Sequence, residues 1–128
     1  MNTKYLMIST SILLGALGIV LSFLPDEIIQ LLGSNPDRVI LLVLQLTGAL
    51  YIGFALMNWM ARRNIIGGVY SRPLAMGNFA HFFVGGMALI KFVSSDQALA
   101  ILWTLAGIYI AFAICFGLVM FRHPTKKV

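Results

Sequence analysis

Hydrophobic residues along the chain gather into four long runs, separated by short segments that contain charged residues, proline and glycine. The runs cover about residues 5–24, 39–61, 74–93 and 98–121. Each is close to the length of about 20 apolar residues that a helix needs to cross a bilayer. None alternates apolar and polar residues as a barrel strand does, and helices satisfy their own backbone groups in lipid. The pattern therefore predicts an all-α protein, a four-helix transmembrane bundle that forms a single integral membrane domain over residues 1–128.

The segment between the first two runs predicts one further, short helix. After Pro25, apolar residues are interspersed among polar ones as far as Gly33. Such a segment is typical of an amphipathic helix at a membrane interface, and glycine commonly ends a helix. We therefore expect an interfacial helix between the first and second spans.

Residues that favour helix N-termini precede the second and fourth runs. We expect Ser34 or Asn35 to cap the second span and Pro36 to be its first helical residue. Ser94 precedes Gln97 by three residues, which is the spacing of a capping box, so we expect Ser94 to cap the fourth span.

The composition excludes an ordinary soluble domain. Of the 128 residues, 60% are hydrophobic and 10% are charged, and the mean hydropathy is +0.95. Soluble domains have about 45–50% apolar and about 25% charged residues. A domain of this size leaves much of its surface in water, so it could not hide this much apolar surface. The chain is therefore expected in a membrane.

Basic and acidic residues fall on opposite sides of the predicted spans. One side carries both termini, the second connection and seven of the nine basic residues: Lys4, Arg62, Arg63, Arg72, Arg122, Lys126 and Lys127. The other side carries all four acidic residues and the two remaining basic ones: Asp26, Glu27, Asp37, Asp96, Arg38 and Lys91. By the positive-inside rule we expect both termini in the cytoplasm and the protein in the cell inner (plasma) membrane. The net charge of +5 then reflects topology, and we expect no nucleic-acid partner.

Polar residues within the second and third runs share one face of each predicted helix. Tyr51, Asn58 and Arg62 are separated by seven and four residues, and Asn78 and His81 by three. At about 100° per residue, each set forms one stripe. At about 1.5 Å per residue, Asn58 lies about 6 Å and His81 about 12 Å from the cytoplasmic ends of their spans. We therefore expect the two stripes to face each other in the cytoplasmic half of the bilayer.

Two hypotheses explain this cluster. In the first, the polar side chains are interhelical hydrogen-bonding groups that fix the register of the bundle, each bond contributing about 0.6 kcal/mol. In the second, Tyr51, Asn58, Asn78 and His81 line a polar pocket that is open to the cytoplasm. The second follows from the cost of placing polar and ionisable groups within a membrane, where they usually serve a function.

Three arginines lie at the expected mouth of that pocket, namely Arg62, Arg63 and Arg72. They are explained equally by topology and by contact with anionic lipid headgroups. Alternatively they form an anion site, because the start of the third span adds its helix dipole to their charges. A phosphate-bearing lipid headgroup would satisfy both hypotheses.

Several kinds of chemistry lack the residues they need. No predicted span contains Asp or Glu, which argues against an antiporter that carries protons on a membrane carboxylate. The sequence shows no metal-ligand cluster and no nucleophile with a nearby base, and its one cysteine, Cys115, lies within the fourth run. We expect no cofactor, no metal and no catalytic residue.

The four runs, the Leu24-Pro25 turn after the first of them and the glycine-rich segments are similar to small bacterial four-helix membrane proteins of the DoxX-like kind. The resemblance covers most of the chain at the level of the fold. It implies a four-helix membrane fold and assigns no functional residue.

These observations favour a non-enzymatic binding or accessory subunit with a cytoplasmic-side polar pocket for a lipid headgroup or a small polar ligand. The expected partners are membrane lipids, especially anionic ones, and a second copy or another membrane protein. A small oligomeric channel or transporter is the alternative, in which polar stripes of several copies line a path. A third hypothesis is a membrane enzyme that uses His81 as an acid and base.

Overall fold

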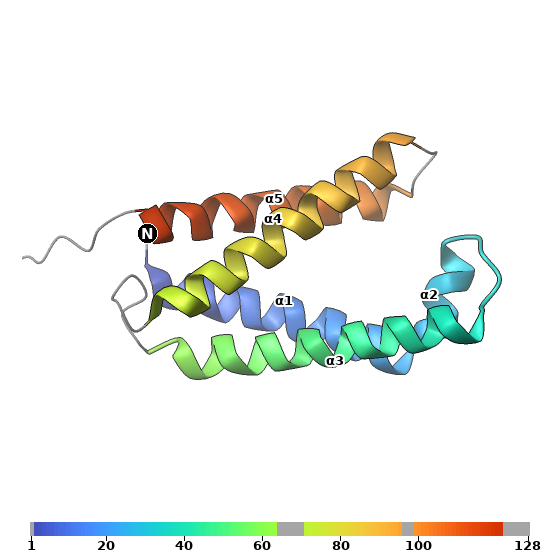
Figure 1. Ribbon diagram of the computed structural model, residues 1–128, viewed down its shortest axis with the longest axis horizontal. Coiled ribbons are helices and arrows are strands. Elements are labelled where there is room, and N and C mark those ends of the chain that lie inside the picture. The colour runs from blue at the N-terminus through green and yellow to red at the C-terminus, as the bar shows by residue number, and fades with distance from the viewer. Residues whose placement is uncertain (1, 64–70, 96–98, 122–128) are drawn as a thin grey trace, which may run out of the picture. The chain divides into compact units, whose positions relative to one another are not determined.

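The computed structural model describes residues 2–63, 71–95 and 99–121, and all the regular structure in these segments is helical (Figure 1). The helices are α1 (Thr3–Phe23), α2 (Pro25–Leu31), α3 (Arg38–Ala61), α4 (Arg72–Ser95) and α5 (Ala100–Phe121). By length and composition, α1, α3, α4 and α5 can each cross a membrane. This confirms the all-α class and the four predicted spans, whose described ends fall within two residues of the expected ones. The predicted first residue of the fourth span, Ala98, lies outside the described residues.

The chain divides into two compact units. The first comprises Met1–Arg63 and contains α1, α2 and α3, and the second comprises Asn64–Val128 and contains α4 and α5. Each unit is built around one pair of long helices, α1 with α3 and α4 with α5. The expectation of a single domain over residues 1–128 stays a prediction.

The short helix α2 ends as its sequence predicts. Gly33 has a φ of +76°, a left-handed conformation that glycine adopts without steric cost. The Ser34 N–H donates to the Ile29 carbonyl at 3.1 Å, and the Gly33 N–H donates to the Gln30 carbonyl at 3.0 Å. These two bonds form a Schellman motif, which satisfies carbonyls that the end of a helix leaves unpaired. The glycine therefore stops α2 and turns the chain towards α3.

The helix of the second long span begins two residues after Pro36, the predicted first helical residue, so the prediction of its cap is wrong. Asp37 is the N-cap of α3, with an extended backbone, and its carbonyl accepts a hydrogen bond from the Leu41 N–H at 2.9 Å. Ser34, Asn35 and Pro36 all precede the helix. Asp37 is the cap by its extended backbone, since its side chain makes no capping hydrogen bond, and Asn35, which is followed by proline, is biased towards an extended conformation. Among four consecutive residues that all suit a helix start, the sequence does not identify the one that is used.

Ser94 does not cap the fourth long span either. It lies in the last turn of α4, which continues to Ser95, and the Ser95 hydroxyl donates to the Phe92 carbonyl at 2.9 Å. Serine readily forms such bonds within its own helix, so these serines extend α4 instead of starting α5. Gln97, the other half of the predicted capping box, lies outside the described residues.

In the first unit, α1 and α3 pack antiparallel with their backbones almost in contact. The Ser11 hydroxyl donates to the Ala55 carbonyl at 2.7 Å near one end of the contact, and Gly18 faces Gly48 near the other. A Cβ added at Gly48 would lie 2.7 Å from the Gly18 carbonyl oxygen and 2.8 Å from the Ser22 backbone nitrogen. Only glycine fits at these positions, because backbone atoms of the facing helix lie within 3.0 Å of each added Cβ and cannot move aside as a side chain can. Small residues bring membrane helices together in this way.

In the second unit, α4 and α5 pack antiparallel around Phe82. This side chain is fully buried, and its ring centroid lies 5.0 Å from that of Phe112, 5.1 Å from that of Tyr109 and 6.0 Å from that of Phe116. Aromatic pairs at such distances contribute about 0.5–1.5 kcal/mol beyond the area that they bury. One phenylalanine of α4 thus meets three aromatic residues of α5, which fixes the register of this pair.

The contact at Gly48 gives a test of how the first unit is held together. We expect Gly48→Ala to lower the free energy of unfolding by about 1–3 kcal/mol, because the new methyl group must push two backbones apart. Gly53→Ala on the same helix is the control, since no described atom lies within 4 Å of the Cβ that it adds. Unfolding by sodium dodecyl sulfate in mixed micelles measures both variants. Equal stability of the two would contradict the close backbone contact.

Candidate polar site within the spans

The polar pair His81 and Tyr109 lies near the middle of α4 and α5. His81 is the tenth of the 24 residues of α4, and Tyr109 is the tenth of the 22 residues of α5. The Tyr109 hydroxyl oxygen lies 3.4 Å from His81 Nε2, and the two ring centroids are 5.5 Å apart. A neutral imidazole nitrogen accepts a hydrogen bond from a tyrosine hydroxyl, or donates one to its oxygen when it carries the proton. Two polar side chains from different helices therefore meet at a depth where both spans are otherwise largely apolar.

Glycine and aromatic packing hold this pair in place. Tyr109 is 2% exposed, and its ring packs edge-on against Phe82. A Cβ at Gly85 would lie 2.9 Å from Tyr109 Cε1, so the missing side chain of this glycine makes room for the tyrosine ring. His81 lies one turn before Gly85 on the same face of α4, where the hydroxyl of the seated tyrosine reaches it. The apolar contacts thus determine where the polar groups meet.

Asn78 lies one turn before His81 on α4 and is fully buried. Its Nδ2 donates to the Leu74 carbonyl of its own helix at 2.9 Å. Such a bond satisfies one donor of the amide without help from another helix. Asn78 and His81 are therefore neighbours on one helix, as their spacing predicts.

The first unit carries its own buried polar residues. Asn58 on α3 and Thr10 on α1 are both 0% exposed. Given the antiparallel register set by Ser11 and Ala55, Thr10 and Asn58 lie at about the same level of this helix pair. Among the described residues, the Thr10 hydroxyl has no hydrogen-bond partner. Leaving a buried hydroxyl unsatisfied costs about 1–3 kcal/mol, so Thr10 marks a polar position that packing alone does not explain.

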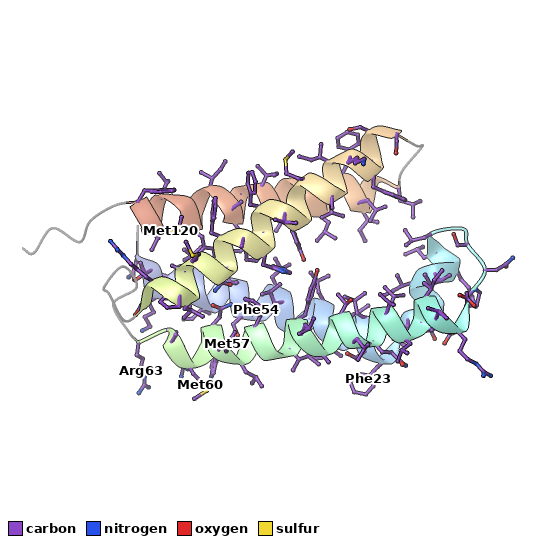
Figure 2. All side chains as sticks on the ribbon, in the orientation of Figure 1. Phe23, Phe54, Met57, Met60, Arg63 and Met120 are labelled. Carbon is purple, nitrogen blue, oxygen red and sulfur yellow. The ribbon has the colours of Figure 1, made fainter. Side chains whose placement is uncertain are left out.

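Three arginines are expected at the mouth of the predicted polar pocket, and each has different surroundings. Arg62 follows the last residue of α3, where its guanidinium donates to the Trp59 carbonyl and lies 4.1 Å from the centroid of the Trp59 ring. This side chain closes the C-terminus of its own helix, where a cation is also favoured by the helix dipole. Arg63 is exposed and points away from the α3 ribbon (Figure 2). Arg72 is the exposed first residue of α4.

The predicted site residues thus fall into two groups. Asn78 and His81 share α4 in the second unit, whereas Tyr51 and Asn58 share α3 in the first unit. Their assembly into one pocket stays a prediction. Sequence reasoning missed Tyr109 and Thr10, although each carried a signal. Tyr109 is a tyrosine in mid-span instead of at the interface, where tyrosine is usual, and Thr10 belongs to a Ser-Thr-Ser run within an apolar span.

The described residues offer hydrogen-bonding groups in place of metal ligands. They contain no group of three or more His, Cys, Asp or Glu side chains that could hold a metal ion. His81, Tyr109 and Asn78 in the second unit, and Asn58 in the first, supply hydrogen-bond donors and acceptors. Groups of these kinds suit the recognition of hydroxyl, amide or phosphoryl oxygens.

Comparison with protein-family models, with curated proteins and with solved structures finds no match for this chain. The resemblance to the DoxX-like kind therefore stays a prediction.

The contact between His81 and Tyr109 can be measured with a double-mutant cycle of His81→Leu and Tyr109→Phe. We expect a coupling energy of about 0.6 kcal/mol, the mean for hydrogen bonds between membrane helices. Tyr109→Phe keeps the aromatic ring on Gly85 and Phe82, so the cycle isolates the hydroxyl. Thr104→Val with His81→Leu is the control cycle, because the Thr104 hydroxyl donates to the Ala100 carbonyl of its own helix at 3.1 Å. A coupling energy no larger than that of the control would refute the contact.

Proposed function

We propose that the protein is a small, non-enzymatic, multi-pass membrane protein, a binding or accessory subunit that holds a lipid headgroup or another small polar ligand among the polar residues of its spans. The observation that carries this proposal is the His81–Tyr109 pair in mid-span. Ionisable and strongly polar groups at membrane depth are costly, and proteins retain them mainly where they serve a function. A ligand with hydroxyl or phosphoryl oxygens would use their hydrogen-bonding capacity.

The first unit supports the proposal independently through Thr10. A threonine in a helix commonly bonds a carbonyl of the preceding turn, as Thr47 does with Val43 at 2.8 Å. The buried Thr10 hydroxyl makes no such bond. A polar ligand beside Thr10, at about the level of Asn58 in this helix pair, would supply the missing hydrogen-bond partner.

The orientation that we propose places both termini in the cytoplasm and the protein in the inner (plasma) membrane. Seven of the nine basic residues then face the cytoplasm. Arg63 and Arg72 would lie at the level of the lipid phosphates on that side, where each cation near an anionic surface contributes about 1 kcal/mol. Anionic lipid is accordingly the ligand class that the charge distribution favours.

Native mass spectrometry of the protein released from nanodiscs of phosphatidylethanolamine and phosphatidylglycerol tests the proposed binding function. We expect a discrete bound mass on the wild-type chain that is lost in the Asn78→Ala, His81→Ala double variant. Thr10→Val should also weaken retention of this mass without lowering the free energy of unfolding, because the hydroxyl makes no bond within the described residues.

Thr47→Val is the matched control, since its hydroxyl is already bonded within α3. A bound mass that is equal in the wild type and all variants would contradict the proposal. If the wild type carried no bound mass and the double variant were less stable, Asn78 and His81 would be interhelical hydrogen-bonding groups instead of ligand-binding residues.

Cysteine labelling tests the proposed orientation. In a Cys115→Ala background, single cysteines at Asn2 and Ser34 would be probed in intact bacterial cells with a maleimide that does not cross the inner membrane. We expect Ser34→Cys to react and Asn2→Cys to react only after the membrane is broken, because the positive-inside rule places Asn2 in the cytoplasm. The reverse pattern would contradict the orientation, and labelling of both in intact cells would contradict a single orientation.

A further inference from the structure

A groove with almost entirely apolar walls runs along the surface of the α4–α5 pair. It has a volume of about 410 Å³ and is lined by residues of these two helices alone. Ligand sites in proteins typically measure about 300–1,000 Å³. The residues that shape it are Phe79, Phe83, Ile114, Gly117, Leu118 and Phe121. The groove is thus large enough for part of a small molecule, and it offers that molecule almost only hydrocarbon.

Stacked aromatic rings form one wall of the groove, and a glycine forms part of its floor. The ring centroids of Phe79 and Phe83 are 5.6 Å apart, with 18° between the ring planes. The Phe79 ring lies against Gly117, where an added Cβ would be 3.3 Å from Phe79 Cε2. Across the groove, Leu118 is 47% exposed and Ile114 is 59% exposed. These surfaces are large and apolar, and neither helix covers them.

The groove is separate from the polar pair. His81 follows Phe79 by two residues, or about 200° around α4, so the two side chains leave opposite faces of the helix. On α5, Leu118 follows Tyr109 by nine residues, or about 180°, whereas the groove residues Ala113 and Gly117 lie within about 80° of Tyr109. Neither His81 nor Tyr109 is among the residues that line the groove, so the inference that follows does not rest on the proposed function.

The side chain of Arg72 provides a cation near one end of the groove, on the same face of α4. Arg72, Phe79 and Phe83 are separated by seven and four residues, which places both phenylalanines on the face of α4 that carries Arg72, each within about 20° of it. Arg72 is exposed and lies about 10 Å along the helix axis from Phe79. The start of α4 adds the positive end of the helix dipole at the same place. An anionic group at Arg72 and a hydrocarbon chain in the groove would therefore be aligned.

The shape of the groove favours a flexible chain over another helix. Close contacts between membrane helices need small residues that let backbones approach, as Gly18 and Gly48 do here. In the groove, Gly117 is already covered by Phe79, and the rim consists of bulky side chains such as Phe121, which is 76% exposed. A helix could not come close to this floor, whereas an acyl chain could follow it.

We propose that the α4–α5 groove is a specific site for one anionic phospholipid, with an acyl chain between Phe79 and Leu118 and the phosphate at Arg72. Apolar walls bind the chain through van der Waals contact, and the cation selects the charged headgroup. This lipid is held in the groove of the α4–α5 pair and is distinct from any ligand of the polar pair.

Competition between two lipids tests this site. The full chain would be reconstituted in nanodiscs of equal amounts of phosphatidylcholine and phosphatidylglycerol, released, and analysed by native mass spectrometry. We expect the phosphatidylglycerol of the groove to be retained on the wild type and on the His81→Ala variant, in addition to any molecule that the polar pair holds in the wild type. Leu118→Trp and, separately, Ile114→Trp should abolish this retention by filling the groove.

Two matched variants distinguish the site from general lipid contact. Ile101→Trp introduces the same side chain at a 62% exposed position of α5 outside the groove, and should leave the bound lipid in place. Arg72→Gln should lower the preference for phosphatidylglycerol over phosphatidylcholine about fivefold, because the contribution of one cation near an anionic surface corresponds to about that change in affinity. Lys91→Gln, at the opposite end of α4, should leave the preference unchanged.

The proposal is overturned if the wild type retains no phospholipid, or if Ile101→Trp removes it as effectively as Leu118→Trp does. A wild-type dimer that Leu118→Trp converts to monomer would likewise overturn it, because the groove would then be an interface between two copies. Loss of the bound lipid in His81→Ala alone would assign that lipid to the polar pair.

Photocrosslinking gives a second measurement that needs no variant to fold. Phosphatidylglycerol with a diazirine on one acyl chain would be added to the wild-type protein, and the modified peptides would be mapped by mass spectrometry. We expect stronger labelling of residues 110–121 than of the exposed faces of α1 and α3. Equal labelling of all four long helices would refute a specific groove.

Discussion

Two helices in a bilayer gain little from burying apolar side chains against each other, because lipid is as apolar as they are. Pairing must therefore come from close van der Waals contact and from the few polar groups that can bond across helices. In the first unit, Gly18 and Gly48 meet this constraint by letting the α1 and α3 backbones touch. The same closeness allows the short Ser11 side chain to reach the Ala55 carbonyl.

The second unit meets the same constraint with aromatic rings. Phe82 inserts among the aromatic residues of α5, and Gly85 leaves space for the ring of Tyr109. This packing brings the Tyr109 hydroxyl to His81, so a polar contact depends on an apolar arrangement. The packing of these rings also holds α4 and α5 in register at the level of His81, although the residues of α4 around His81 are mainly glycine and phenylalanine.

The two faces of the α4–α5 pair differ in chemistry. One presents neutral hydrogen-bonding groups within the spans, and the other presents an apolar groove in line with Arg72. A phospholipid contains both kinds of partner, a polar headgroup and hydrocarbon chains. The proposals for the two sites are nevertheless independent, because neither His81 nor Tyr109 lines the groove.

The sequence alone determined the membrane class, the four spans and the short helix ended by Gly33, because length, apolarity and glycine chemistry are local properties. It also placed Asn78 and His81 on one face of one helix, since helical periodicity is local too. It did not identify Asp37 as the cap, because several neighbouring residues suit that role equally. Tyr109 as the partner of His81, and the groove beside Gly117, were decided only by the tertiary structure. Both depend on which residues of α5 come level with α4, and that register is set by ring and glycine contacts between helices, which no single run of sequence contains.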